Sequence, residues 1–148
     1  FYNTARCWPT RAALLTGYYA QSVRRDVVPG VKSGGQGLRP KWAPLVSEIL
    51  QKANYRTYHS GKWHIDGKPS ENGFNSSYQL EDHDRHLNPQ RHLLNSKSLP
   101  PITKIGEYTS SDGIASYAID QLKDHVRNYS EKPFFSFVAF TAPHFPLH

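Results

Sequence analysis

The sequence predicts an α/β fold in which helices flank a sheet, and three patterns support this prediction. Residues 43–53 place apolar side chains on one helical face, and residues 55–60 then alternate and carry aromatic residues as strands do. Residues 110–128 form a second helical pattern. Residues 134–140 form a nearly continuous apolar run, which is typical of a strand buried on both faces. Helices that alternate with such strands indicate a parallel α/β sheet.

The first half of the chain contains a short helix, a loop and a longer helix. The short helix is expected directly after Cys7, and Gly17 can end it. The stretch from Pro29 to Pro40 is rich in glycine and is predicted to be a surface loop. The helix over 43–53 then presents one apolar face, which comprises Leu45, Val46, Ile49, Leu50 and Ala53.

The second half begins with a polar excursion from Lys62 to Gly106, where too few apolar positions recur to predict long elements. Ser110 or Ser111 can cap the helix that follows, which is expected to end near Asn128. Its apolar face comprises Ile114, Tyr117, Ala118, Leu122 and Val126. The excursion is therefore predicted to be irregular, between two regular regions.

Length and charge exclude several classes of protein. A chain of 148 residues is long enough for one domain with a core. No run approaches the roughly 20 apolar residues that span a bilayer, so no membrane span is expected. The net charge of +6 suits an anionic partner. The basic residues are scattered, and only Arg24 and Arg25 are adjacent, which disfavours nucleic acid.

Cys7 is the only cysteine, so the chain forms no intramolecular disulfide. An isolated cysteine is most often a small buried apolar residue. Here it precedes a short helix and lies close to Arg11, and both the helix N-terminus and the guanidinium favour negative charge. This arrangement indicates an anion site.

The segment around Cys7 resembles the signature of the formylglycine-dependent type I sulfatases. That signature is Cys-x-Pro-x-Arg followed by Thr-Gly, and its positions are matched by Cys7, Pro9, Arg11, Thr16 and Gly17. The resemblance implies that a maturation enzyme oxidises Cys7 to formylglycine, which then acts as the nucleophile and as a metal ligand. It also implies that Arg11 holds the hydrated aldehyde.

Two further segments resemble elements of the same family. Gly61-Lys62-Trp63-His64 is similar to an element whose lysine contacts the sulfate and whose histidine contacts the formylglycine and helps to expel sulfate. Without the first motif, this segment would more often be an ordinary surface turn. The run around Pro143 and His144 resembles an Ala-Pro-His-x-Pro element, whose histidine is a candidate general acid near the ester oxygen.

Both histidines directly follow predicted strands. In open α/β sheets the chemistry lies at the carboxyl ends of strands, where we expect His64 and His144. The run Glu81-Asp82-His83-Asp84-Arg85-His86 contains metal-ligand residue types, but a solvated loop or a substrate contact is favoured over a metal site. Arg85 is predicted to touch an anionic substrate, as are Lys62 and His144.

The resemblance covers almost the whole chain and implies an alkaline-phosphatase-like mixed sheet flanked by helices. Residues 1–148 would form part of the N-terminal catalytic domain, without its start and its C-terminal portion. The family's metal, usually Ca²⁺, needs an acidic pair before Cys7 and further ligands after His148. We therefore expect the isolated 148 residues to be inactive, although the parent protein is expected to be a sulfuric ester hydrolase of the arylsulfatase type.

Two alternatives remain at this point. One is a phosphonate or phosphate monoester hydrolase of the same superfamily, and the other is a non-catalytic homologue that binds sulfated glycans. The expected partners are a sulfated small molecule or glycan and a formylglycine-generating enzyme. Family habit favours a carbohydrate sulfate and a periplasmic or secreted location.

Overall fold

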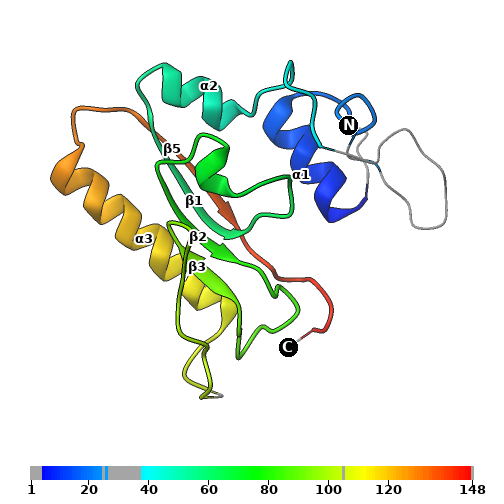
Figure 1. The fold of residues 1–148 in the computed structure, drawn as a ribbon. Coiled ribbons are helices and arrows are strands. Elements are labelled where there is room, and N and C mark those ends of the chain that lie inside the picture. The colour runs from blue at the N-terminus through cyan, green and yellow to red at the C-terminus, as the bar shows by residue number, and fades with distance from the viewer. Residues whose placement is uncertain (1–4, 25, 27–37, 105, 148) are drawn as a thin grey trace.

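A five-stranded mixed sheet forms the centre of the part of the chain that the structure describes (Figure 1). This computed structural model describes residues 5–24, 26, 38–104 and 106–147. The strand order is β4-β3-β2-β1-β5. The strands are β1 (Arg56–Lys62), β2 (Ser76–Leu80), β3 (His92–Leu94), β4 (Lys97–Ser98) and β5 (Phe134–Ala139).

The central strand β1 is parallel to both of its neighbours. It pairs with β2 from Tyr58 opposite Ser76, and with β5 from Arg56 opposite Phe134. β2 then pairs antiparallel with β3, and β3 antiparallel with β4. The predicted parallel pairing is therefore right for β1, β2 and β5, whose carboxyl ends meet at one edge of the sheet.

The polar excursion is more regular than its sequence predicts. Residues 62–106 contain β2, β3, β4 and the short 3₁₀ helix η1 (Pro69–Glu71), so the prediction of an irregular segment is wrong for 76–80 and 92–98. The three strands are five residues long or shorter. Such strands carry too few apolar positions for a period to be recognised, and they form because β1 offers an edge for β2.

Three α-helices accompany the sheet within the described residues. They are α1 (Cys7–Thr16), α2 (Val46–Lys52) and α3 (Ser110–Asn128). As predicted, Gly17 ends α1; it adopts a left-handed conformation with φ of 74°, which favours glycine. The cap of α3 differs from the prediction, because the Thr109 side chain accepts a hydrogen bond from the backbone N–H of Asp112. Most of the predicted glycine-rich loop lies outside the described residues.

The helices cover opposite faces of β1. On one face α3 packs closely: Ser60 Oγ donates to the carbonyl of Ile114 at 2.7 Å, and Tyr58 Oη lies 3.0 Å from His125 Nδ1. On the other face His59 packs against Trp63. The core cluster on that side links α1 and α2 to the sheet and comprises Leu15, Leu45, Trp63, Ile65 and Phe74.

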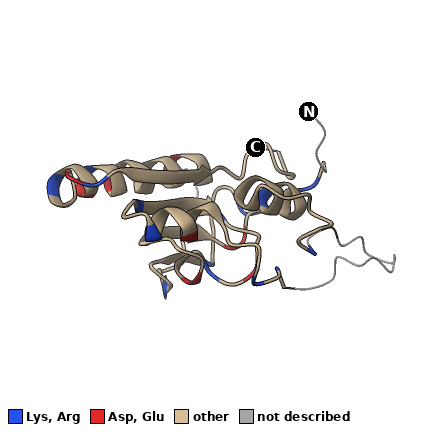
Figure 2. Cartoon of the chain, turned by 90° about the horizontal axis from the view of Figure 1, so that it is seen from above, with Lys and Arg blue, Asp and Glu red and all other residues tan. Residues whose placement is uncertain are grey.

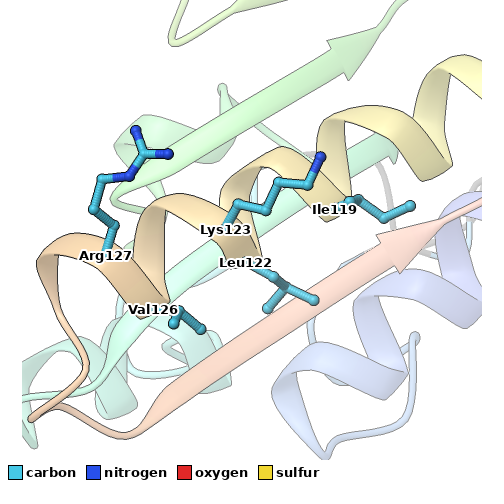
Figure 3. A pocket seen from close by; sticks show the side chains of 5 residues that line it. All are labelled: Ile119, Leu122, Lys123, Val126 and Arg127. Atoms are coloured by element: carbon cyan, nitrogen blue, oxygen red, sulfur yellow. The ribbon is translucent and has the colours of Figure 1, made fainter.

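The outer surface of β5 is exposed, contrary to the predicted strand buried on both faces. Phe134 and Val138 are 49% and 37% exposed, because β5 is an edge strand among the described residues. The neighbouring side of α3 is also apolar. Leu122 and Val126 point towards β5 in Figure 3 and line a surface groove with Ile119.

Two predicted helical faces are therefore only partly buried. On α3 Val126 is 72% exposed, because the helix instead turns Ile114, Ala118 and Gln121 towards the sheet. On the shorter α2 Ile49 is 53% exposed. Within the described residues no helix is both long and apolar enough to cross a membrane. Lys and Arg residues are scattered over several elements (Figure 2).

Candidate active site

The candidate site lies where α1 begins and β1 ends. Cys7 is the first residue of α1, and Lys62 is the last residue of β1. Pro9 is tolerated in the first helical turn because the N–H groups there have no acceptor within the helix. Arg11 lies one turn further on, where its Nη1 donates to the carbonyl of Lys62 at 2.7 Å. This hydrogen bond fastens the start of α1 to the end of β1.

Gly61 explains why β1 can bring Lys62 so close to β5. It has a φ of 117°, and a Cβ atom at this position would lie 2.2 Å from the carbonyl oxygen of Ala139. Only glycine fits without moving one of the two strands. The glycine of the Gly-Lys-Trp-His segment is thus required by the packing of the sheet.

Lys62 is a buried cation that lies next to Cys7. Its side chain is 2% exposed, and Nζ makes no hydrogen bond to any of the described residues. Burial lowers the pKa of Lys62, and the guanidinium of Arg11 lowers it further, whereas the neighbouring Cys7 raises it. A buried ammonium group of this kind is stabilised when an anion binds beside it.

Arg11 contributes a second positive charge beside Cys7. Burial lowers the pKa of Arg11, and Cys7 again acts in the opposite direction. The free thiol of Cys7 is half-buried and lines a pocket together with Arg6, Thr10 and Arg11. The start of α1 therefore lies close to two cations, Arg11 of the same helix and Lys62 at the end of β1, and this arrangement favours an anion.

Three imidazole rings form a row next to Lys62. The ring centroid of His83 lies 5.4 Å from that of His64 and 4.7 Å from that of His144. Burial lowers the pKa of His83, and the charge of Lys62 lowers it further. His64 also packs edge-on against Trp8 at 5.3 Å, so the row reaches back to α1.

His83 is held in this row by the turn that follows β2. The carboxylate of the buried Asp82 accepts hydrogen bonds from the backbone N–H groups of Gln90, at 2.7 Å, and Arg91, at 3.1 Å. His83 Nδ1 lies 3.3 Å from the carbonyl of Glu81. Asp82 thus shapes the turn, and His83 projects from it.

The structure separates the predicted site residues into two groups. Cys7, Arg11 and Lys62 are joined directly, whereas His64 and His144 are brought together through His83. Sequence reasoning passed over His83 as an individual residue. The signal available was its place in a polar run directly after the segment that forms β2, and that signal did not distinguish His83 from its neighbours.

Arg85 is less well placed than the other predicted residues. It is exposed, and its backbone N–H donates to the carbonyl of Asp82. The pocket that holds Lys62, His64 and His83 has a volume of about 410 Å³ and is lined by Arg91 instead. A contact between Arg85 and substrate stays a prediction.

The described residues do not by themselves provide a metal centre. Among them no three His, Cys, Asp or Glu side chains are grouped so that they could hold a metal ion. The residues near Cys7 are mostly cationic or neutral, which does not fit the carboxylate-rich ligand set of Ca²⁺. That Cys7, as formylglycine, is one ligand of Ca²⁺ stays a prediction, and the acidic ligands are not found among the described residues.

Comparison with known proteins decides the family. The family model described as Sulfatase matches residues 1–148. The chain belongs to the sulfatase family. It is 34% identical to an uncharacterised sulfatase of Schizosaccharomyces pombe, over 99% of this chain and 31% of that protein. It is 27% identical to the human N-acetylgalactosamine-6-sulfatase, over 96% of this chain and 31% of that protein.

Solved structures show the same fold. The crystal structure of Ps i-CgsB in complex with k-i-k-neocarrahexaose matches with a TM-score of 0.74 and 24% identity, over 96% of this chain and 36% of that one. The predicted α/β fold, with a mixed sheet of the sulfatase type, is confirmed. The chain spans about a third of the length of the curated relatives it matches.

Proposed function

We propose that the protein to which this chain belongs is a sulfuric ester hydrolase whose nucleophile is made at Cys7. The observation that carries the proposal is the buried ammonium of Lys62, which lies beside Cys7 and Arg11 and is not paired with a carboxylate among the described residues. A sulfate ester carries one negative charge, which compensates for a buried cation. Membership of the sulfatase family supports the same reaction.

Each residue of the site has a role that its position suits. Lys62 stabilises the charge that develops on the sulfuryl oxygens during transfer. Arg11 stabilises the nucleophile and fixes the end of β1 through its hydrogen bond to Lys62. His144 donates a proton to the leaving oxygen of the alcohol, and His64 accepts a proton when the sulfated enzyme breaks down.

The nucleophile we propose is formylglycine, produced from Cys7 by a formylglycine-generating enzyme. Cys7 suits this modification because it is a free cysteine on the first turn of a helix, and its side chain lines a pocket. When present, the hydrated aldehyde supplies a hydroxyl group that attacks sulfur. Ca²⁺ remains part of the proposal as the ion of the complete protein, and no step is assigned to it.

A sulfated carbohydrate is the substrate class we favour. One relative is named for N-acetylgalactosamine 6-sulfate, and one structural neighbour contains neocarrahexaose. The side chains that line the pocket beside Lys62 include the polar Gln79 and Glu81, which can hydrogen-bond to sugar hydroxyls. A secreted or periplasmic location is consistent with extracellular glycans as substrates. Residues 1–148 would then be the N-terminal part of the catalytic domain.

The test compares two esters on the full-length protein after coexpression with a maturation enzyme. We expect turnover of 4-nitrophenyl sulfate to exceed that of 4-nitrophenyl phosphate. The opposite order would support a phosphatase or phosphonate hydrolase of the same superfamily. Peptide mass spectrometry should show a loss of about 18 Da at Cys7 with hydrazide labelling. An intact thiol, no turnover and retained glycan binding would instead support a non-catalytic homologue.

A further inference from the structure

His86 is buried directly beneath the segment that carries His144. It is 4% exposed and belongs to the turn after β2. Its Nε2 lies 3.1 Å from the backbone carbonyl oxygen of His144. Its Nδ1 lies 3.1 Å from Ser110 Oγ and 3.3 Å from Thr141 Oγ1.

The partners of His86 define which nitrogen carries the proton. A carbonyl oxygen only accepts hydrogen bonds, so the Nε2–H of His86 donates to His144. Nδ1 lies within hydrogen-bonding distance of the hydroxyl groups of both Ser110 and Thr141. These two hydroxyl groups are 2.8 Å apart and complete the network.

The network joins three segments that are distant in the sequence. Ser110 is the first residue of α3, and its backbone N–H donates to the carbonyl of His86. Thr141 follows β5, and its carbonyl accepts from the backbone N–H of His144 at 2.8 Å. Ser110 and Thr141 are 0% and 3% exposed, so water does not compete for these contacts.

Besides the hydrogen bond between its N–H and the carbonyl of Thr141, His144 makes contacts through its ring. Its ring is packed against His83, and its Nδ1 lies 2.5 Å from the carbonyl of the next residue, Phe145. Phe145 and Leu147 are 79% and 75% exposed, so the segment after His144 has little packing. The hydrogen bond from His86 therefore fixes the backbone at the residue whose ring must reach the leaving oxygen.

We infer that His86 is a positioning residue, which holds the backbone of His144 so that its imidazole can protonate the leaving group. The inference rests on the proposed sulfatase function and deepens it. Because His86 is only 4% exposed, it acts in this inference through His144 rather than through its own contact with substrate. A shift of about 1 Å in a catalytic group lowers a rate by roughly 100-fold, so one buried hydrogen bond can matter at this position.

The experiment uses a matched pair of variants in the full-length, matured protein. In His86→Gln the side-chain amide nitrogen can replace Nε2 and keep the bond to His144. In His86→Asn the shorter amide can reach only the hydroxyl groups. Thr141→Val is a third variant, which removes one hydroxyl partner of Nδ1, so the ring that makes the Nε2 bond is held less firmly.

The readout is kcat/KM for a series of aryl sulfates, from 4-nitrophenyl to phenyl sulfate. Phenolate is a more basic leaving group than 4-nitrophenolate. Cleavage of phenyl sulfate therefore depends more strongly on a proton donor than cleavage of 4-nitrophenyl sulfate does. We expect His86→Asn to lower kcat/KM for phenyl sulfate roughly tenfold more than for 4-nitrophenyl sulfate. His86→Gln should keep the wild-type dependence on the leaving group, and Thr141→Val should fall between the two.

An equal loss for all esters in His86→Asn would show a purely structural role and overturn the inference. So would identical behaviour of the Asn and Gln variants. If the Asn variant does not fold, Thr141→Val must show the same leaving-group dependence in weaker form, or the inference fails.

If the wild type cleaves no sulfate ester, the proposed function fails. In that case, amide hydrogen exchange over residues 141–147 still tests whether His86 holds the backbone of His144. Equal exchange in the Asn and Gln variants would reject the positioning role.

Discussion

At the level of single residues, the charges near Cys7 are arranged for binding rather than for stability. Lys62 is buried beside Cys7 with no carboxylate paired to it among the described residues, and Arg11 adds a second cation to the same region. A folded chain retains such an arrangement at a cost in stability. Buried charges without a counter-charge are common at functional sites, because the ligand supplies the opposite charge.

Replacing Lys62 should separate stability from activity. Lys62→Met removes the buried charge, so we expect an unchanged or higher thermal midpoint, together with a loss in kcat/KM of about 100-fold or more. Lys62→Arg keeps the charge in a different shape and should retain more activity than Met. Thermal unfolding and 4-nitrophenyl sulfate hydrolysis of the full-length protein measure both effects. A Met variant with normal activity would remove Lys62 from the mechanism.

His59 should make stability depend on pH. It is fully buried next to Trp63, Phe74 and Phe137, and burial lowers its pKa to about 3. Below about pH 6.5 the unfolded chain binds a proton that the folded chain does not, so stability is highest above this pH and falls on acidification towards pH 3. Between pH 7 and pH 5, the lowered pKa of His59 alone decreases the free energy of unfolding by about 2 kcal/mol.

His59→Phe should flatten that dependence. Phenylalanine has no titrating group and fills the same aromatic environment. We expect the free energy of unfolding to fall by about 2 kcal/mol less between pH 7 and pH 5 than in the wild type. Urea unfolding at the two pH values provides the comparison. Equal pH slopes in the two proteins would show that His59 is not responsible.

At the level of elements, the close contact between β1 and β5 determines where the site forms. β5 pairs with β1 up to Ala139, opposite Gly61, and the segment with His144 follows directly. The same strand pair thus places Lys62 and His144 at one edge of the sheet. Any change that separates β1 from β5 should affect both residues together.

Gly61→Ala tests this contact. The added Cβ would collide with the carbonyl oxygen of Ala139, so we expect destabilisation by about 3–5 kcal/mol. Gly106→Ala is the matched control, because Gly106 also has a positive φ but a Cβ there meets no atom within 4 Å. Urea unfolding of both variants measures the difference. Similar losses would mean that backbone strain, and not the β1–β5 contact, dominates.

At the level of the whole molecule, the sheet is exposed at β5, which is its edge strand among the described residues. Phe134 and Val138 of the edge strand β5 are exposed, and Leu122 and Val126 in the groove on α3 point towards β5 (Figure 3). Parallel strands are usually covered on both faces. The relatives that match the chain are about three times as long, and the grouped acidic ligands of a metal site are not found among the described residues.

We therefore expect the isolated 148 residues to be inactive and the full-length protein to be active. Hydrolysis of 4-nitrophenyl sulfate by the two proteins, each matured at Cys7, is the direct comparison. The Lys62→Met form of the short chain serves as the control for contaminating activity. Turnover by the short chain above that control would show that residues 1–148 hold a complete site.

Sequence alone was sufficient where the information is local. The helical period predicted the positions of α2 and α3 to within a few residues, and Gly17 marked the end of α1. The resemblance of the segments at Cys7, Lys62 and His144 identified the family before any contact was known. These patterns can be recognised from the sequence because each depends only on residues that are close together along the chain.

Tertiary structure alone decided what depends on contacts across the sheet. His83 and His86 stand in the same polar run, yet one joins the row of imidazoles and the other is buried beneath His144. The pairing of β2 with β1 and the turn fixed by Asp82 make this distinction. The sequence determined the residue types and their order. The sheet register determined their distances, because residues such as His86 and His144, which are 58 positions apart, meet only when the strands pair.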